Sequence, residues 1–178
     1  QSAVGVERQL PWNTTMSVNY LDSRGVHLLL SRDINAPLPG TFAAGAPVYP
    51  YLAVNGTGQI NQIESTGFFR QRQVMVNINS RINRNFAMFG NYTYNVANST
   101  SDSASPVSDP YNVAADYGVS ALNVNHRVFI GGSVNSRWNI RLSPFVVYQS
   151  SRPFNILIPQ DMIGSGILNQ RPSYAGPG

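Results

Sequence analysis

Six segments of the chain alternate apolar and polar residues with a period of two. The clearest begins at Phe86, and no charged residue occurs between Phe86 and Ser101. A helix, with its period of about 3.6, would scramble this pattern, so the segment predicts a β-strand with one apolar and one amide-rich face. One face carries Phe86, Met88, Gly90, Tyr92, Tyr94 and Val96, and the other carries Ala87, Phe89, Asn91, Thr93, Asn95 and Ala97.

Five further segments repeat this alternation. Their opposite sides carry mainly amides, hydroxyls and arginines, so each predicts another strand with one apolar side. The segment around Val4 is the shortest. The positions on the apolar sides are Val4 and Val6; Met16, Val18 and Tyr20; Val74, Val76 and Ile78; Leu122, Val124, His126, Val128 and Ile130; and Ile140, Leu142, Val146 and Tyr148.

The breaks between these segments alternate strictly between short and long. The short breaks lie at 11–13, 83–85 and 136–138, and the long ones at 32–59, 98–116 and from 150 onward. Short turns on one side and long loops on the other are typical of antiparallel strands that cross a membrane. The sequence therefore predicts an all-β fold: an antiparallel up-and-down meander of about six strands that is part of a larger transmembrane β-barrel.

Strand length and the placement of aromatic residues fit a membrane crossing. A tilted strand needs about 9–11 residues to cross the hydrocarbon layer, and the segment that begins at Phe86 is long enough. Aromatic residues are expected at both interfaces of such a barrel. They occur near the ends of the predicted strands: Trp12, Trp138, Tyr20, Tyr94 and Tyr148.

Composition narrows the class further. Charged residues make up 11% of the 178 residues and hydrophobic residues 42%, which argues against both a typical soluble surface and a disordered chain. Polarity comes from amides and hydroxyls, with 19 Asn, and all 12 basic residues are Arg. The net charge of +4 is spread without a basic run, so no nucleic-acid partner is expected. No run of 18 apolar residues predicts a transmembrane helix.

A soluble β-sandwich, such as a carbohydrate-binding module, also has alternating strands and stays open as an alternative. The sparse charge disfavours it, because soluble surfaces are about a quarter to a third Lys, Arg, Glu and Asp. Asn, Ser, Thr and Gln suit the wet interior of a barrel. A passive porin or an adhesin barrel fits the same strand pattern.

The sequence shows no catalytic or metal-binding motif. We therefore expect no enzymatic activity, no catalytic residue, no metal and no cofactor. His27 and His126 lack metal-ligand spacing. His126 is expected at a strand end near an interface. The stretch 98–103 has too few carboxylates for a Ca²⁺ loop and predicts a surface loop.

Ligand contacts are expected from two places. The first is the lumen face, where Arg127 is also expected to pair with a carboxylate on a neighbouring strand or on a plug. Its residues are Asn77, Asn79, Asn91, Asn95, Asn123, Asn125 and Arg127. The second is a set of aromatic residues in the long loops over the outer mouth: Phe42, Tyr49, Tyr51, Tyr111 and Phe154.

An ordered series of short motifs carries a family resemblance. The motifs are ERQLP at 7–11, SVNY at 17–20, SRG at 23–25, NAPLPG at 35–40, DYG at 116–118, NHRVF at 125–129 and PFNI at 153–156. The series resembles the barrel region of TonB-dependent outer-membrane receptors of the Oar-like group, whose full-length members carry a carboxypeptidase-regulatory-like domain. One departure is NQRP at 169–172, where Gln170 stands in place of an expected Asp. This removes any ion or polar contact that the carboxylate would make.

The resemblance implies a barrel of about 22 strands with a plugged lumen, in the outer membrane of a Gram-negative bacterium. Residues 1–178 would then be a partial barrel domain, with the plug, the signal peptide and the final strand lying outside it. The implied function is energy-coupled uptake of a small solute, whose identity the sequence does not reveal. The implied partners are outer-membrane lipid, the remaining strands and plug, and the inner-membrane TonB system acting through the plug.

Overall fold

A computed structural model describes residues 1–102, 106–136, 138 and 140–172. Its strands and helices are β1 (Ser2–Leu10), β2 (Thr14–Asp33), α1 (Leu52–Asn55), β3 (Asn61–Asn83), β4 (Phe86–Ser99), the 3-10 helix η1 (Val113–Asp116), β5 (Gly118–Val119), β6 (His126–Asn135), β7 (Arg141–Leu142) and β8 (Phe145–Gln149). The described strands form one sheet in the order β1-β2-β3-β4-β6-β7, with β5 beside β4 and β8 beside β6. The predicted all-β antiparallel meander is confirmed.

The chain divides into two compact units, which we name the strand unit and the loop unit. The strand unit comprises 1–23, 71–97 and 123–152, and the loop unit comprises 24–70, 98–122 and 153–178. Each unit is described by itself below.

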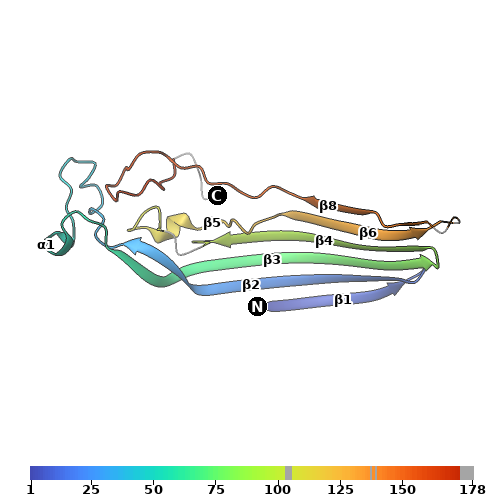
Figure 1. Cartoon of the computed structure of the whole chain (residues 1–178). Coiled ribbons are helices and arrows are strands. Elements are labelled where there is room, and N and C mark those ends of the chain that lie inside the picture. The colour runs from blue at the N-terminus through green and yellow to red at the C-terminus, as the bar shows by residue number, and fades with distance from the viewer. Residues whose placement is uncertain (103–105, 137, 139, 173–178) are drawn as a thin grey trace. The chain divides into compact units, whose positions relative to one another are not determined.

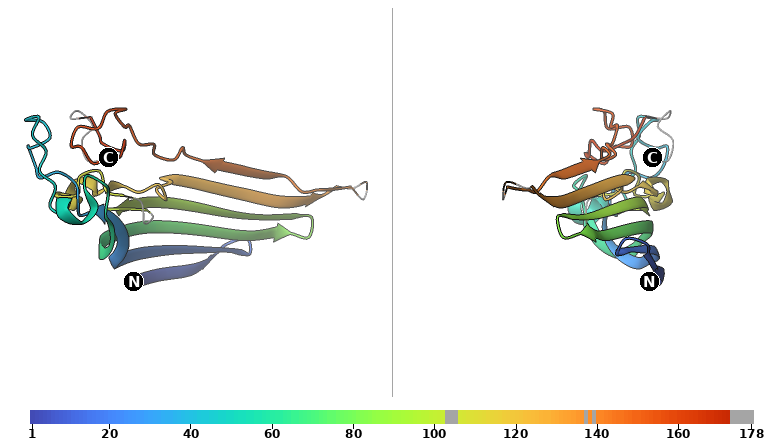
Figure 2. Two further views of the ribbon diagram at one scale, coloured as in Figure 1. Left: turned by 60° about the vertical axis from the view of Figure 1, so that its left-hand side comes forward. Right: turned by 90° about the vertical axis from the view of Figure 1, so that its right-hand side faces the viewer.

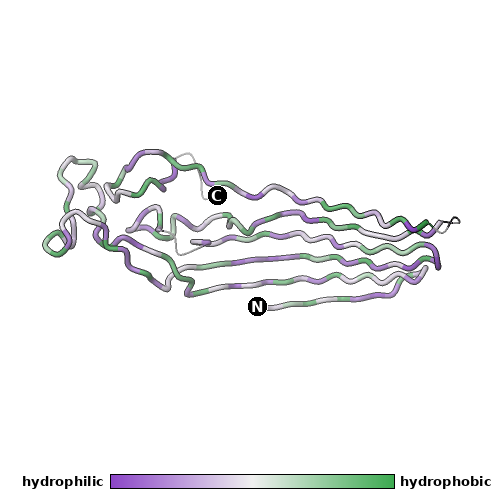
Figure 3. Tube along the Cα trace, viewed as in Figure 1, coloured by the Kyte–Doolittle hydropathy of each residue, from purple (hydrophilic) through white to green (hydrophobic). Residues whose placement is uncertain are grey.

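In the strand unit, the strands lie side by side in chain order, as the views of Figures 1 and 2 agree. The registers place apolar residues opposite apolar residues: Val6 pairs with Val18, and Val128 pairs with both Tyr92 and Tyr148. Figure 3 shows hydrophobic and hydrophilic residues alternating along these strands. Because paired residues point to the same side of a sheet, the apolar positions share one face, as predicted.

This apolar face is not packed into a core. The exposed fraction is 69% for Val4, 60% for Leu142 and 60% for Val146. Among the described residues, the buried hydrophobic side chains are Leu30, Ala36, Ala97, Val107 and Val124. An apolar face this extensive is a surface for contact with another apolar phase or molecule.

The short breaks are tight turns, as predicted. Between β1 and β2, Trp12 and Asn13 both have positive φ angles, of 61° and 49°, which matches the right-handed twist of the flanking strands. In the turn between β3 and β4, the backbone N–H of Asn85 donates to Oδ1 of Asn83 over 2.8 Å. Part of the turn at 136–138 lies outside the described residues, because Arg137 is not among them.

Two predicted strands differ from the structure. The segment that begins at Leu122 forms a strand only from His126, because the Asn123 side chain takes a place in the hydrogen-bonding ladder: its Oδ1 accepts the backbone N–H of Ala97 over 2.9 Å. The segment 140–149 is interrupted between β7 and β8 at Pro144, which has no N–H to donate to a ladder. The Pro144 carbonyl still accepts the Gly132 N–H over 3.0 Å.

Candidate functional site

The amide-rich face of the strand unit carries a row of side-chain hydrogen bonds that crosses three strands. Asn91 on β4 donates from Nδ2 to Oδ1 of Asn77 on β3 over 2.6 Å, and Asn77 donates from Nδ2 to Oγ of Ser17 on β2 over 3.1 Å. Thr93 donates from Oγ1 to Oδ1 of Asn91 over 3.2 Å. The row is neutral, and each amide uses both a donor and an acceptor within reach of its neighbours.

A second group of amides comes from β3, β4 and the segment that precedes β6. Gln71 donates from Nε2 to Oδ1 of Asn95 over 2.8 Å. Asn123 donates from Nδ2 to Oδ1 of Asn125 over 3.2 Å, and the backbone N–H of Asn95 donates to the Asn125 carbonyl over 2.9 Å. The structure therefore brings together five of the residues predicted to line the lumen, in these two groups.

The other two predicted lumen residues are not joined to these groups. Asn79 is exposed. Arg127 is exposed and lies opposite Thr93 on one side and Gln149 on the other. Among the described residues, no ion pair joins Arg127 to a carboxylate on a neighbouring strand. A pair with a plug stays a prediction.

Sequence reasoning missed an aromatic pair on the same face. The rings of Phe89 and Phe129 lie 5.6 Å apart between centroids. The Phe89 ring covers Gly131, where an added Cβ would lie 2.6 Å from its Cζ, so glycine is needed for this contact. Phe89, Phe129 and Gly131 have odd numbers, like Asn91. The alternation of the strands therefore predicts that they lie on the amide-rich face.

On the opposite face, His126 lies at the first position of β6, as predicted for a strand end. Its Nδ1 and the Tyr92 hydroxyl are 2.9 Å apart, and its ring centroid is 5.3 Å from that of Tyr94. These three rings form an aromatic cluster with a polar edge, the type of group found at membrane interfaces.

In the loop unit, the buried side chain of Asn35 holds one long loop in shape. Its Nδ2 donates to the carbonyls of Gly56 and Gly58 over 3.1 and 2.6 Å, and its Oδ1 accepts the backbone N–H of Tyr51 over 2.8 Å. Asn35 is 1% exposed. Its amide therefore satisfies backbone groups that the short helix α1 leaves without partners.

Two of the five predicted loop aromatics lie together. Phe42 and Tyr111 line a small pocket of about 130 Å³ with Pro37 and Met162 among its other walls. The Tyr111 hydroxyl donates to the Ala36 carbonyl over 2.7 Å. Burial and the nearby carboxylate of Asp33 raise the pKa of Tyr111, so the hydroxyl remains a donor.

The other three predicted aromatics are not in this pocket. Tyr49 is half-buried, Tyr51 is 44% exposed, and Phe154 is 84% exposed. A role for any of the five in ligand contact stays a prediction.

Two aspartates organise the remaining loops. Burial alone would raise the pKa of Asp102, but hydrogen bonds donated by Ser120, Ser99 and the Ala121 N–H outweigh it, and the pKa is lowered. The carboxylate thus accepts hydrogen bonds from residues on both sides of the loop. Ser103 itself lies outside the described residues.

Asp161 plays the corresponding role near the end of the described chain. It accepts the backbone N–H groups of Ile163, Gly164 and Gly166 over 3.2, 2.7 and 2.6 Å. The side chain of Gln170 donates from Nε2 to Oδ1 of Asp161 over 3.3 Å and accepts the Met162 N–H over 2.6 Å. Burial opposes ionisation of Asp161, yet these donors lower its pKa. An Asp at position 170, which the resemblance leads us to expect, would put two carboxylates side by side.

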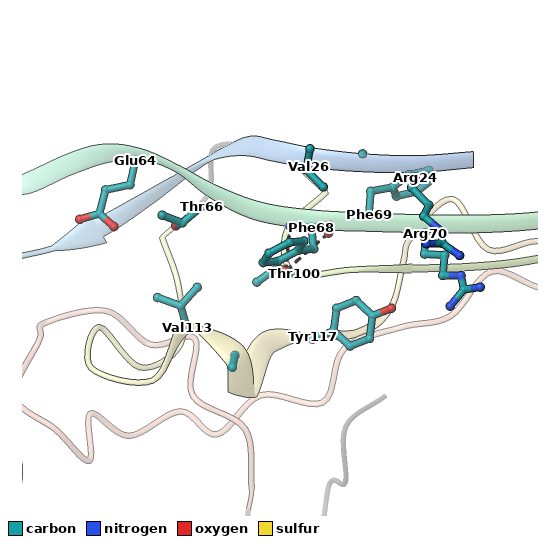
Figure 4. A pocket seen from close by; sticks show the side chains of 12 residues that line it. Arg24, Val26, Glu64, Thr66, Phe68, Phe69, Arg70, Thr100, Val113 and Tyr117 are labelled. Atoms are coloured by element: carbon teal, nitrogen blue, oxygen red, sulfur yellow. Dashed lines mark hydrogen bonds between the residues drawn. The ribbon is translucent and has the colours of Figure 1, made fainter. Parts of the chain in front are cut away.

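A pocket of about 860 Å³ in the loop unit contains none of the predicted site residues. Figure 4 shows Phe68 and Tyr117 along it, Arg24 and Arg70 near one end, and Glu64 at the other. Strand β3 supplies Glu64, Phe68 and Arg70. All three have even numbers, so their side chains lie on the same side of the strand. This pocket combines an apolar lining with two guanidinium groups.

The described residues contain no group of three or more His, Cys, Asp or Glu that could hold a metal ion. His27 instead contacts the Ser65 carbonyl through Nδ1 over 3.2 Å. None of the helices in the described part of the chain is long and apolar enough to cross a membrane.

Comparison with known proteins identifies the family. A family model described as "Outer membrane beta barrel domain" matches residues 1–178. No curated protein matches the chain, and no solved structure does. The family match covers every strand, both amide groups and the exposed apolar face. The chain therefore belongs to the outer membrane beta barrel domain family.

Proposed function

We propose that the chain is a wall segment of a TonB-dependent receptor and takes part in energy-coupled uptake of a small solute. As a member of its family, the chain lies in the outer membrane of a Gram-negative bacterium and forms part of a β-barrel. The ordered motif series that resembles Oar-like receptors supports the more specific assignment. The plug, the TonB system acting through it and the solute are further parts of this proposal.

The observation that carries the proposal is a hydrogen-bonded assembly of loops. We name the described parts of 34–60, 100–117 and 153–172 the first, second and third loops. Long loops that are fixed to one another form a shaped surface, which suits recognition of one solute better than free diffusion of many. The bonds between loops run from Gln59 Nε2 to the Ser165 carbonyl (2.6 Å), from the Tyr111 hydroxyl to the Ala36 carbonyl (2.7 Å) and from Asn169 Nδ2 to the Val107 carbonyl (3.1 Å).

The two faces of the strand unit supply the second support. The exposed apolar face, with Val4, Val6 and Val146, suits contact with outer-membrane lipid. The neutral amide rows around Asn77 and Asn95 suit a water-filled or plug-filled lumen, because they offer hydrogen bonds without a strong field. The described strands form a single sheet, in contrast to the two packed sheets of a sandwich.

Energy coupling is the property that separates this proposal from a passive porin or an adhesin. We would delete the gene for the natural full-length chain and compare, by mass spectrometry, which solutes the mutant and parent cells remove from the medium. A solute depleted only by parent cells is then followed in cells that lack TonB. A receptor loses this uptake without TonB, whereas a porin retains it, and an adhesin affects no solute.

Loop recognition is tested in the same uptake assay. We expect Phe42→Ala to weaken uptake, because the Phe42 ring packs against Gly164 and closes the small pocket beside Tyr111. Leu168→Ala is the control, since this exposed apolar side chain lies outside the pocket and is not among the predicted ligand contacts. Unchanged affinity and flux in the Phe42 variant would contradict a role for this aromatic site. The proposal assigns no catalytic residue, and a non-enzymatic function stays a prediction.

A further inference from the structure

Exposed phenyl rings interrupt the amide-rich face of the strand unit. Phe89 of β4 and Phe145 of β8 both pair with Gly131 of β6, which lies between them in the sheet (Figure 1). Paired residues point to the same side of a sheet, so the two rings share the face that carries Asn91. Phe89 is 48% exposed and Phe145 is 73% exposed. A water-filled lumen gives no reason for these rings, which mark a surface for an apolar group.

The two rings line a cavity of about 310 Å³. The neighbouring row of the same face, nearer the short turns, carries only small side chains. Ala87 pairs with Ser133 in this row, and Ser143 also lines the cavity. These small residues leave open the space that larger side chains would fill. The volume lies at the lower end of the range of about 300–1,000 Å³ that small-molecule sites occupy.

A single guanidinium group lines the same cavity from the side of the short turns. Arg141 of β7 pairs with Asn135 of β6 and is exposed. In the described part of the chain, no hydrogen bond or ion pair joins its side chain to another group. Residues on one face of a strand repeat about every 7 Å, so Phe145, Ser143 and Arg141 follow one another at such steps. The cavity therefore has aromatic walls at one end and one positive charge at the other.

We propose that this cavity binds a small solute that joins an aromatic ring to a single carboxylate. The ring packs against Phe89 and Phe145, since aromatic rings favour tilted or offset contacts. The carboxylate accepts two parallel hydrogen bonds from Arg141. One carboxylate balances this one guanidinium, whereas a phosphate group would carry up to about two charges. The inference rests on the proposed function, because it places the site on the lumen side, and it names the class of solute.

The test uses the natural full-length chain in detergent and follows binding by fluorine NMR, with protein-free micelles as the baseline. The probe is para-fluorophenylacetate. Two comparison probes are para-fluorophenylethanol, which lacks the charge, and fluoroacetate, which lacks the ring. We expect the first to bind about tenfold more tightly than either comparison probe. Arg141→Gln should lower its affinity about tenfold, as expected for the loss of one charged hydrogen-bonded pair. Equal affinity for the alcohol would overturn the proposal.

The matched control is Arg81→Gln. Arg81 is exposed on β3, shares the odd numbering of Asn77 and lies outside the cavity. Affinity in this variant should change less than about twofold, because salt screens exposed charges away from the site. An equal loss in the Arg81 and Arg141 variants would mean general electrostatic attraction and would overturn the proposal. Retained affinity in the Arg141 variant would do the same.

Further variants test the ring contact and the shape of the cavity. Phe145→Ser should weaken binding of para-fluorophenylacetate while leaving Arg141 in place. Ser133→Leu fills the cavity and should abolish binding. Arg141→Lys keeps the charge but loses the bidentate geometry, so its affinity should be intermediate. It replaces the Gln variant if that chain fails to fold, as judged by heat-dependent mobility on a gel. Unchanged affinity in both the Phe145 and Ser133 variants would overturn the site.

Uptake of the probe by cells with and without TonB separates this inference from energy coupling. Absence of binding by the full-length chain would overturn the inference alone, since TonB-dependent uptake of another solute would persist. Binding at the cavity followed by uptake that does not need TonB would support the site and contradict energy coupling.

Discussion

Asn91 and Asn77 bind each other across neighbouring strands, with Nδ2 of Asn91 donating to Oδ1 of Asn77 over 2.6 Å. We assign this side of the sheet to the lumen, because burying amides in hydrocarbon costs several kcal/mol where they lack partners, whereas water can satisfy their remaining hydrogen bonds. The apolar positions next to them along the chain, such as Val76 before Asn77, face the other way. A pair of neighbouring substitutions can therefore report which side faces the membrane.

We expect Val76→Arg to destabilise the full-length barrel by about 2–4 kcal/mol in a bilayer, because an arginine near the membrane midplane of the lipid face has about that cost. Asn77→Arg, one residue away, should change the unfolding free energy much less, since we assign that side to the lumen. The measurement is denaturant unfolding of the barrel in lipid vesicles. Equal destabilisation by the two arginines would contradict the assigned faces.

Asn35→Ala should loosen the first loop. It removes three side-chain hydrogen bonds and leaves the Gly56 and Gly58 carbonyls and the Tyr51 N–H without these partners. Because Tyr51, Gly56 and Gly58 are exposed and water can replace their partner, each lost bond should cost about 0.5–1.5 kcal/mol of local stability. Hydrogen exchange of the amides between 51 and 60 measures it. Asn55→Ala is the control: its exposed side chain makes one bond, to the Gln59 carbonyl, and its removal should leave exchange at Tyr51 unchanged.

The second loop should depend on pH through Asp102. The pKa of Asp102 in the folded chain is lowered, because the donors Ser120, Ser99 and Ala121 N–H outweigh the effect of burial. Its stabilisation of the loop is therefore fully present above the ordinary carboxyl pKa of about 4 and is lost as the pH falls through the lower folded value. Hydrogen exchange at Ala121, corrected for intrinsic rates, should rise in that acidic range.

Asp102→Asn provides the check on this pH dependence. The amide keeps the size of the side chain but does not titrate, so exchange at Ala121 should be faster at neutral pH and flat across the acidic range. A variant that kept the acid transition would show that another group is responsible.

Gln170→Glu should weaken the turn around Asp161. The change keeps the length of the side chain and an acceptor for the Met162 N–H, but replaces the donor to Asp161 with a second carboxylate. Repulsion should raise the pKa of Asp161 and speed exchange at Gly164 and Gly166 at neutral pH. Acidification should reverse the effect as one carboxyl is protonated. Exchange as slow as in the unaltered chain at neutral pH would contradict this role of Gln170.

The strands and turns could be predicted because their signals are local. The alternation that begins at Phe86 assigns every second residue to the same face of the strand. Asn is common in turns, so Asn13 and Asn83 indicate where the strands end. Pro144 was a visible signal for the break between β7 and β8, since a proline cannot donate to the ladder. The loss of strand at Asn123 had no such signal, because a side-chain amide there substitutes for backbone pairing.

The sites were harder to predict, because they depend on residues distant in the chain. The alternation alone predicts that Asn77 and Asn91 lie on the amide-rich face. The hydrogen bond between them is seen only in the structure. The neighbourhood of Arg24 and Arg70 depends on how strands β2 and β3 pair, which composition does not show. Asn35 gave no sign of its role, since its partners lie 16 to 23 residues further along the chain.

In the described part of the chain, β1 is hydrogen-bonded to β2 on one side only, and it is nine residues long. The backbone N–H and C=O groups on its other edge can form hydrogen bonds with any extended polypeptide. Valines along this strand would make such adhesion favourable in water. When residues 1–178 are purified alone, they should form aggregates or ribbons through this free edge of β1. A short peptide that pairs with β1 should keep the protein monomeric.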